Sequence, residues 1–379
     1  MVVDLLIIQP TPFCNINCSY CYLPDRNNSK KISIDVVEHI VNALIQDNLL
    51  HNQLSIVWHA GEPLVLSPAF YKPLFQLLES KLRPIGISIQ HSIQTNGTLL
   101  TQEWCDFIKE YEIKIGVSID GPRHIQDANR KTRSGKGTFD KVIQGLNLLQ
   151  SNGISYHGIA VVSESSISSP EDIFSFFYNN GFYQLGLNIE EVEGVHDHSS
   201  VFSDSLYPKV VSFYSHLFEL FMASDKHMII REFDKCRNAI MRNPDTADIT
   251  KLTTETHQNL PMAIISVDYE GNFSTFSPEL IGQRVKEYNN FIFGNIQYNR
   301  FSQPKEKQLL KAVTKEINLG IIKCKKECEY FSVCGGGAPA NKYFENGSFN
   351  SSETKYCKYN IKVPTDIVLS YMEEKLSIN

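Results

Sequence analysis

The sequence predicts an α/β protein built on a partial (β/α)6 barrel of the TIM type. Apolar segments alternate with longer amphipathic segments, and this unit recurs six times before residue 190. The apolar segments are rich in Ile and Val and show little alternation, which is typical of strands buried on both faces of a parallel sheet. The expected strands are Leu5–Gln9, Leu54–His59, Ile87–Gln94, Ile113–Ile119, Tyr156–Val162 and Gln184–Ile189, and the expected helices cover 34–48, 68–82, 101–110, 137–151 and 170–180.

The second half of the chain is expected to add a bridging region and a C-terminal extension. Residues 206–223 have a helical pattern, and residues 243–259 are polar and indicate an exposed connection. Apolar segments at 263–268 and 272–276 flank Glu270-Gly271, which predicts a hairpin. Further helices are expected at 303–318 and 364–376. We therefore divide the chain into a barrel (1–225), a bridging region with the hairpin (226–318) and a C-terminal domain with a closing helix (319–379).

The composition is that of an ordinary globular protein. The 379 residues carry a formal net charge of −6, and 42% of them are apolar and 21% charged. The negative balance argues against nucleic acid as the main partner, because proteins that bind it usually present a basic face. Apolar runs such as Leu5–Ile8 are far shorter than the roughly 20 residues that span a bilayer, and the N-terminus lacks the features of a signal peptide. We expect a cytoplasmic protein that binds neither nucleic acid nor a membrane.

Nine cysteines are present, and seven of them form two groups near the chain ends. Without an export signal they are expected to stay reduced and to bind metal. The first group, Cys14, Cys18 and Cys21, has the spacing C-x3-C-x2-C in one short segment. Three thiolates leave one iron of a [4Fe–4S] cluster open for a cofactor or substrate. Zinc is the alternative, although a zinc site would need a fourth ligand.

The second group contains four cysteines, Cys324, Cys328, Cys334 and Cys357. Four thiolates complete the coordination of one [4Fe–4S] cluster and leave no iron open. The run Gly335–Gly337 directly after Cys334 would let the backbone fold tightly around such a cluster. A zinc site with four thiolate ligands is again the alternative.

The first cysteine group, together with Tyr20 just before Cys21, resembles the signature of the radical S-adenosylmethionine (SAM) superfamily. The resemblance implies that the three cysteines hold a [4Fe–4S] cluster whose open iron chelates the methionine part of SAM. Reductive cleavage of SAM would give a 5′-deoxyadenosyl radical that abstracts a hydrogen atom. The protein would orient the substrate and exclude water. A reducing partner such as flavodoxin or ferredoxin is also implied.

Short motifs after the next strands resemble the SAM pocket of the same superfamily. Gly61-Glu62-Pro63 ends the second expected strand, with Ala60 where the family usually has a glycine. Arg130 resembles an arginine beside the cofactor carboxylate, an anion that suits the planar fork of guanidinium donors. The residues that the resemblance assigns to SAM are Tyr20, Gly61, Glu62, Pro63, Thr95, Asn96, Ser118, Asp120, Arg130 and Val161.

The second cysteine group resembles the SPASM extension of peptide-modifying radical SAM enzymes. That extension usually carries two auxiliary clusters. Here the cysteines expected near Gly271 are absent, and Ala338 stands where a further cysteine is expected. Since the missing residues would serve one cluster and the four present the other, we predict a single auxiliary [4Fe–4S] cluster.

Nearly the whole chain resembles the maturases of glycine-rich-repeat peptides, the GrrM type, and related cyclophane-forming enzymes. These enzymes act on ribosomally synthesised precursor peptides and join an aromatic ring carbon to the β-carbon of a nearby residue. Such chemistry needs a base, for which Asp120 and Glu279 are candidates, although either could be a helix cap or a structural ligand. The segments that carry the resemblance are CNINCSYCYLPDR (14–26), WHAGEPL (58–64), SPELIG (277–282) and CGGGAPANKYFENGSFNSSETKYC (334–357).

Three other functions stay open. Anaerobic sulfatase maturases oxidise Cys or Ser to formylglycine, but they normally carry two auxiliary clusters. A peptide epimerase would need a hydrogen donor, for which the thiol of Cys236 is the candidate. A non-enzymatic iron–sulfur or zinc scaffold would not cleave SAM in the presence of dithionite. Crosslinking removes two hydrogens from the substrate, whereas epimerisation leaves its mass unchanged.

Overall fold

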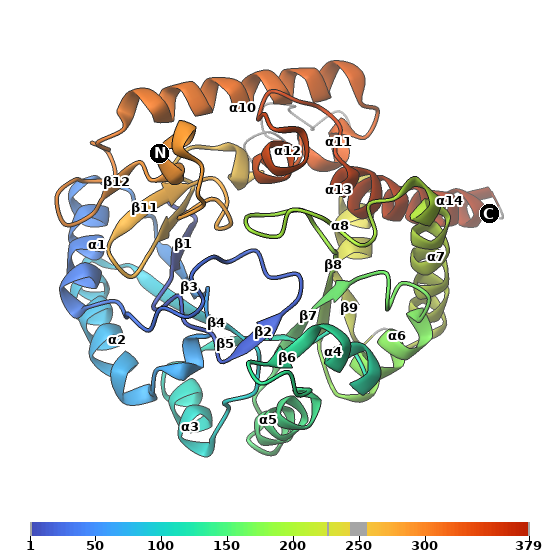
Figure 1. Ribbon diagram of the computed structural model, residues 1–379, viewed down its shortest axis with the longest axis horizontal. Coiled ribbons are helices and arrows are strands. Elements are labelled where there is room, and N and C mark those ends of the chain that lie inside the picture. Colours follow the sequence, from blue (N-terminus) through green and yellow to red (C-terminus); the bar gives the residue numbers. More distant parts are fainter. Residues whose placement is uncertain (1, 226, 243–255, 378–379) are drawn as a thin grey trace.

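One curved sheet organises the fold (Figure 1). The computed structural model describes residues 2–225, 227–242 and 256–377. Within them, ten strands form a sheet in the order β12-β11-β10-β1-β3-β4-β5-β7-β8-β9. The six predicted strands lie next to one another and run parallel. They are β1 (Leu5–Ile8), β3 (Gln53–Trp58), β4 (Ser88–Thr95), β5 (Lys114–Ser118), β7 (Tyr156–Val162) and β8 (Gln184–Ile189).

Helices cover the outer side of this sheet (Figure 1). Local signals define where several of them begin: the side chains of Ser33 and Thr101 each accept a backbone N–H of the helix that follows, and α2 and α6 begin with proline. The buried faces of the helices and strands form one continuous apolar core. The helices are α1 (Ile34–Gln46), α2 (Pro68–Leu82), α3 (Gln102–Glu110), α5 (Phe139–Ser151), α6 (Pro170–Asn179) and α7 (Tyr207–Ala223).

The parallel register brings the carboxyl ends of the strands to one edge of the sheet. Leu5 of β1, for example, lies opposite Ser55 of β3. A separate two-stranded sheet joins β2 (Ile16–Cys18), in the loop after β1, to β6 (Arg130–Thr132). The sequence motifs singled out above follow β1, β3, β4 and β5, so the fold collects them at the same edge.

The bridging region extends the sheet at both edges. β10 (Ile264–Val267) runs parallel to β1, and β11 (Asn272–Thr275) and β12 (Gly294–Asn295) follow antiparallel, so the predicted hairpin is confirmed. At the other edge, β9 (Ile229–Ile230) leads into α8 (Arg231–Ile240), which the sequence analysis did not predict.

The connection expected at 243–259 lies outside the described residues up to 255. Residues 256–259 of this connection are described. The prediction that the whole connection is exposed is wrong there, because Asn259 is buried.

The C-terminal helices close one side of the molecule. The helix expected at 303–318 is longer, because no proline interrupts it after residue 307 and it continues to the second cysteine group. The expected closing helix is confirmed, and it packs against α7 and α8. These elements are α10 (Lys307–Glu327), α11 (Phe331–Cys334), α12 (Pro339–Asn346), α13 (Lys355–Cys357), the π-helix η6 (Lys358–Lys362) and α14 (Val363–Ser377).

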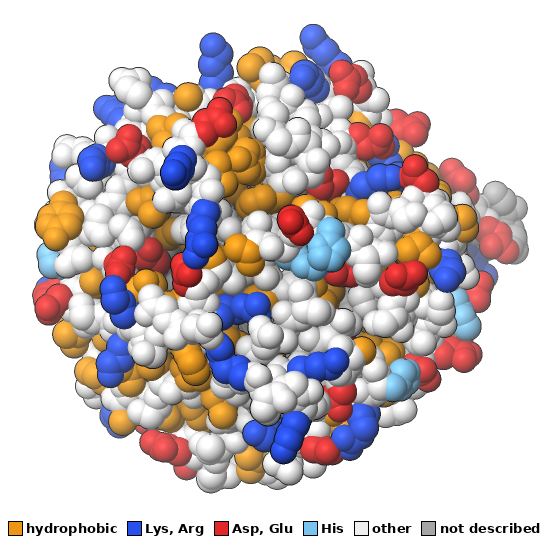
Figure 2. Space-filling view, viewed as in Figure 1, with side chains coloured by type: hydrophobic (Ala, Val, Ile, Leu, Met, Phe, Trp, Pro, Cys, Tyr) orange, Lys and Arg blue, Asp and Glu red, His pale blue; other side chains and the backbone are white. Residues whose placement is uncertain are grey.

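The visible surface mixes charges of both signs. Figure 2 shows Lys and Arg side chains scattered among acidic, apolar and neutral polar ones. Within the described parts of the chain, no helix has the length and apolar character needed to cross a membrane.

Candidate functional site

The first cysteine group lies in a loop that distant parts of the chain hold in place. We call residues 14–21 the cysteine loop. Through the β2–β6 pairing, Cys18 lies opposite Arg130. The backbone N–H of Cys14 donates to the carbonyl of Arg26 (3.2 Å), and Nε of Arg133 donates to the carbonyl of Cys14 (2.7 Å). Arg133 is therefore a structural partner of the cysteine loop, a role that its place in the sequence did not reveal.

Asp120, directly after β5, connects the cysteine loop to the sheet. Its side chain is fully buried. Oδ2 accepts a hydrogen bond from the hydroxyl of Tyr20, and Oδ1 accepts from Nη2 of Arg130 (3.0 Å) and from the backbone N–H of Val161 (3.0 Å). Four residues that the sequence assigned to SAM thus form one network, and in it both oxygens of Asp120 already have partners.

Glu62 forms a second buried network. Its Oε1 accepts from the backbone N–H of Leu64 (2.9 Å) and the hydroxyl of Thr95 (2.6 Å), and its Oε2 accepts from the backbone N–H of Asn96 (2.7 Å). Burial raises the pKa of Glu62 to about 7, while these hydrogen bonds oppose the shift. Nδ2 of Asn96 lies 3.8 Å from the sulfur of Cys14, so the network reaches the first cysteine.

Gly61 is required by a close approach of two backbone segments. Its φ is +60°, and a Cβ atom would lie 2.4 Å from the carbonyl oxygen of Thr11 and 2.5 Å from that of Phe13. The neighbouring Ala60 also has a positive φ, of 74°, which a glycine would adopt with less strain. Pro63 then begins a short 3₁₀ turn. The turn is therefore in close backbone contact with the residues that lead into the cysteine loop.

Ser118, the remaining residue assigned to SAM from the sequence, lies at the end of β5. Its hydroxyl accepts a hydrogen bond from Nε2 of Gln94 (2.8 Å). In the sheet, Ser118 lies opposite Ile159 of β7.

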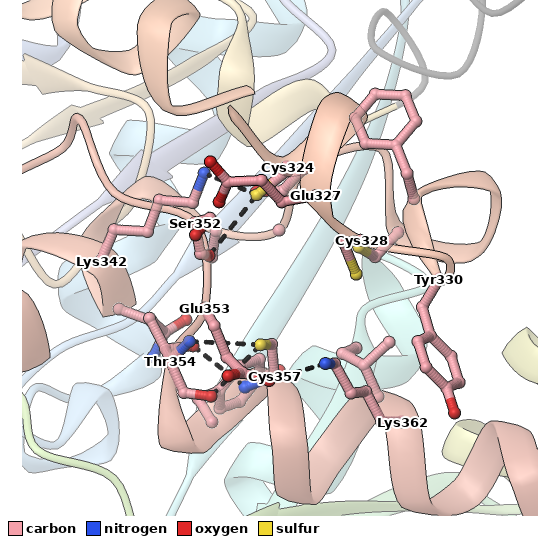
Figure 3. A pocket seen from close by; sticks show the side chains of 18 residues that line it. Cys324, Glu327, Cys328, Tyr330, Lys342, Ser352, Glu353, Thr354, Cys357 and Lys362 are labelled. Carbon is pink, nitrogen blue, oxygen red and sulfur yellow. Dashed lines mark hydrogen bonds and ion pairs between the residues drawn. The ribbon is translucent and has the colours of Figure 1, made fainter. Parts of the chain in front are cut away.

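The second cysteine group lines one cavity of about 180 Å³. Cys324 lies in the last turn of α10, Cys328 caps that helix, Cys334 ends α11 and Cys357 ends α13. Figure 3 shows the sulfurs of Cys324, Cys328 and Cys357 around a common space. The buried Lys342 donates from Nζ to the sulfur of Cys324 (3.3 Å), which places a cation beside a candidate thiolate. We call this the auxiliary site.

Local geometry explains how four short segments meet at the auxiliary site. Gly335, Gly336 and Gly337 have φ values of +61°, +106° and +72°, a left-handed run that other residues rarely adopt. The backbone N–H of Thr354 donates to the sulfur of Cys357 (3.3 Å), and the hydroxyl of Thr354 accepts from the N–H of Cys357 (3.0 Å). The glycine run predicted to fold tightly does so.

A polar cavity of about 730 Å³ adjoins the auxiliary site. Cys334 and Asn341 line both cavities. The larger cavity is also lined by Glu279, one of the two candidate bases, and by Cys236, the candidate hydrogen donor of the epimerase alternative. One wall is the loop after β8, in which the N–H of Val195 donates to the carbonyl of Tyr22, next to Cys21 in the chain (3.2 Å). The cavity therefore lies between the auxiliary site and a loop that is bonded to the residue next to Cys21.

Comparisons with known proteins identify the family. Residues 8–177 match the family model described as the radical SAM superfamily. An uncharacterized protein of Synechocystis sp. is 37% identical over 378 residues, which is 99% of this chain and 93% of that protein. The chain belongs to the radical SAM superfamily. It is therefore an enzyme of the class that uses a [4Fe–4S] cluster and SAM.

Further radical SAM proteins are similar over part or all of the chain. A serine-type anaerobic sulfatase-maturating enzyme of Bacteroides thetaiotaomicron is 39% identical over 170 residues, 43% of this chain and 40% of that enzyme. A cysteine-type enzyme of Clostridium novyi is 25% identical and covers 91% of both chains. Among solved structures, anSMEcpe with bound AdoMet has a TM-score of 0.75 at 21% identity, covering 99% of this chain and 100% of that one. Streptococcus suis SuiB bound to the precursor peptide SuiA has a TM-score of 0.62 at 14% identity, with 94% and 76% covered. Both structures share the fold.

The residues of the cysteine loop fit a radical SAM cluster and its cofactor. Burial raises the pKa of Cys14 to about 12 and that of Cys18 to about 11, so these thiols need cationic iron to become thiolates at neutral pH. Nε of Arg130 is buried without a hydrogen-bond partner, and such a donor suits an anionic group of a bound cofactor. The donor set and the unpartnered Nε–H of Arg130 therefore agree with the family.

Glu191 and Glu193, which line the larger cavity beside Glu279, were not predicted from the sequence. The only signal for them was their position directly after a predicted strand, where the functional loops of such sheets lie.

We expect Asp120→Asn to destabilise the radical SAM fold by about 3–5 kcal/mol, because it leaves the buried guanidinium of Arg130 without its counter-charge. Urea unfolding of the cluster-free protein, followed by circular dichroism, measures this change. Asp140→Asn is the matched control, because its partner Arg123 and Asp140 itself are exposed and the unfolding midpoint should change little. Equal midpoints for the two variants would contradict the anchoring role of Asp120.

Proposed function

We propose that this chain is a radical SAM peptide maturase that joins an aromatic ring carbon to the β-carbon of a nearby residue in a ribosomally synthesised precursor peptide. The observation that carries the proposal is the polar cavity of about 730 Å³, which is lined by both Glu279 and Cys334. A cavity of this size can hold a peptide segment between a base and an auxiliary redox centre. The peptide bound to SuiB and the names of the sulfatase-maturating relatives support a peptide substrate.

In this proposal, the sheet from β1 to β8 with its helices is a partial (β/α)6 barrel of the TIM type. Its parallel strands and the absence of pairing between the edge strands β12 and β9, both within the described residues, support this interpretation. Residues 1–225 form the barrel domain, 226–318 the bridging region and 319–379 a SPASM-like domain. The auxiliary site supports the last assignment, because all its cysteines lie in that domain.

We assign the SAM-binding cluster to Cys14, Cys18 and Cys21, and one auxiliary [4Fe–4S] cluster to the auxiliary site. Zinc would require four donors about 2.3 Å from one centre, whereas the ligands of a cubic cluster stand at separate corners. In the described ranges, no three His, Cys, Asp or Glu side chains are placed to hold a single metal ion. We therefore assign clusters to these thiols rather than single zinc ions. The four auxiliary ligands are Cys324, Cys328, Cys334 and Cys357.

When bound, the clusters and SAM supply a radical that removes a hydrogen atom from the substrate and a centre that accepts one electron. The protein's own residues position the groups that would bind the clusters and SAM. Asp120 fixes Tyr20 and Arg130, and Glu62 fixes the loop after β4. In our assignment, the residues that contact SAM are Tyr20, Gly61, Glu62, Pro63, Thr95, Asn96, Ser118, Asp120, Arg130 and Val161.

Glu279 is the stronger candidate for the base. It lines the cavity, and burial raises its pKa to about 7, which is suitable for accepting a proton near neutral pH. Asp120 is fully buried and its oxygens are bonded to Tyr20, Arg130 and Val161, so we assign it to positioning. Flavodoxin or ferredoxin is the proposed electron donor.

Two alternative modifications have specific support. The sulfatase-maturating relatives favour oxidation of a Ser or Cys side chain to formylglycine. The position of Cys236 on the cavity wall favours epimerisation, because its thiol could return a hydrogen atom to the substrate. The chemical structure of the product distinguishes crosslinking, oxidation to formylglycine and epimerisation.

The reconstituted enzyme should contain about eight iron atoms per chain and release 5′-deoxyadenosine when dithionite is added. Changing Cys14, Cys18 and Cys21 together to alanine should leave about four irons and no 5′-deoxyadenosine. Changing the four auxiliary cysteines should also leave about four irons while SAM cleavage continues. Buried Cys105 outside both groups provides the control Cys105→Ala, which should keep about eight. One zinc per chain in place of four irons would refute the auxiliary cluster.

Short peptides encoded beside this gene, coexpressed with the enzyme, should lose two hydrogens per modified motif. Tandem mass spectrometry should show missing fragments between the joined residues, because a crosslink holds both pieces together. Oxidation of serine to an aldehyde also removes two hydrogens, but that product reacts with a hydrazide reagent and a crosslink does not. An unchanged mass with an inverted α-carbon would establish epimerisation instead.

Glu279→Gln should slow crosslinking by about 100-fold or more while 5′-deoxyadenosine formation continues, because only the proton acceptor is lost. In the wild type, the rate should rise with pH up to about 7 and then level off, since the raised pKa keeps Glu279 protonated at lower pH. Exposed Glu103 provides the control Glu103→Gln. A wild-type rate for Glu279→Gln, or a rate that falls as the pH rises through 7, would exclude this base.

A further inference from the structure

Three glutamates form an acidic wall in the larger cavity. Glu191 and Glu193 come from the loop after β8, and Glu279 comes from the segment after β11. All three side chains are half-buried and line the cavity. Oε2 of Glu191 accepts from Nδ2 of Asn341 (2.6 Å), but no ion pair with Lys or Arg is found for any of the three in the described parts of the chain. We call these residues the acidic wall.

Burial and mutual repulsion favour the neutral forms of the carboxyl groups in the acidic wall. Burial raises the pKa of Glu191 and of Glu279 to about 7, and the charge of Glu279 contributes to the shift of Glu191. Burial followed by the charges of Glu191 and Glu279 raises the pKa of Glu193 as well. Carboxylates this close together cannot all be charged without a cation among them. Glu191 and Glu193 also share a side-chain hydrogen bond, in which one carboxyl group holds a proton. A positively charged ligand would instead favour the charged forms of these groups.

Among the described residues, three Lys or Arg side chains line the cavity, namely Arg231, Lys235 and Arg242, and the first two interact with groups outside the acidic wall. Arg231 of α8 lies 2.6 Å from Glu232 and also donates to the side chain of Asn188 (2.7 Å). Lys235 lines the same cavity, but the charges that act on it are those of Arg231, Glu232 and Cys236. Neither side chain neutralises the acidic wall.

Two polar side chains of the cavity lack partners. Asn360 is 5% exposed, and its Oδ1 accepts from the hydroxyl of Tyr214 (3.0 Å) and the backbone N–H of Ile189 (3.3 Å), while its Nδ2 has no partner. Ser277 is 1% exposed, and its hydroxyl is also without a partner. Leaving such buried groups unpaired is unfavourable. A ligand with carbonyl oxygens, such as a peptide backbone, would satisfy them.

A metal ion is a poor fit for the acidic wall. Throughout the described ranges, no three acidic, histidine or cysteine side chains are arranged to ligate one ion. The wall needs a cation that reaches it on a flexible stem and forms hydrogen bonds to separate carboxylates, as the ammonium of Lys or the guanidinium of Arg does.

We propose that Glu191 and Glu193 bind a basic side chain, Lys or Arg, of the peptide substrate, while Asn360 and Ser277 hold its backbone. This inference rests on the proposed peptide-maturase function and specifies its substrate. A bound cation would also favour the charged form of Glu279, so the correct substrate would prepare its own base. Peptides with a basic residue near the modified position would be selected over neutral ones.

The test uses the reconstituted full-length enzyme and three synthetic tripeptides, acetyl-Ala-X-Ala-amide with X as Lys, norleucine or Glu. Isothermal titration calorimetry measures binding. We expect the Lys peptide to bind at least tenfold more tightly than the norleucine peptide, which has the same stem without the charge. The double change Glu191→Gln and Glu193→Gln should remove this preference, whereas Glu103→Gln, on the outer helix α3, should keep it.

Equal binding of the Lys and norleucine peptides, or no detectable binding of the Lys peptide at millimolar concentration, would overturn the proposal. A Lys preference that survives the double change would also overturn it. Because selectivity in the wild type needs no variant, poor folding of the double variant does not remove the test. SAM cleavage without peptide and the mass of coexpressed peptides report separately on the proposed function, so its failure is distinguishable.

Discussion

The buried carboxylate of Asp120 is the interaction on which the radical SAM site depends. It joins the cysteine loop through Tyr20, β6 through Arg130 and β7 through the backbone of Val161. A loop that carries three thiols has few apolar contacts of its own to fix it. A charged, fully buried anchor supplies that order, because an unpaired charge at this depth would be costly and the paired arrangement is therefore strongly preferred.

A single polar cavity adjoins the auxiliary site, and one of its walls is a loop that is hydrogen-bonded to the residue next to Cys21. Cys334 and Asn341 line both the cavity and the auxiliary site, and the loop that carries Glu191 packs on the backbone of Tyr22. In the proposed function, a substrate in that cavity would contact Glu279 and lie beside the auxiliary site. The helices α8 and α14 pack against each other.

Features that depend on short stretches of chain were predictable. The spacing of Cys14, Cys18 and Cys21 indicated a common metal group, and the Ile- and Val-rich segments indicated parallel strands, because both signals lie within a few residues. The pairing of β10 with β1 was not predictable, since the two strands are more than 250 residues apart in the chain. The same holds for Arg133, whose bond to Cys14 depends on the pairing of β2 with β6.

The sequence by itself determined the class of chemistry, because three or four thiols at fixed spacing define a ligand set whatever surrounds them. Only the tertiary structure decided which carboxyl group serves as an anchor and which lines a cavity. Asp120 and Glu279 were equivalent candidates in the sequence, yet one is enclosed by hydrogen bonds and the other opens into a cavity beside Glu191 and Glu193. Electrostatic energies depend on distances in space and on burial, and neither can be read from the sequence alone.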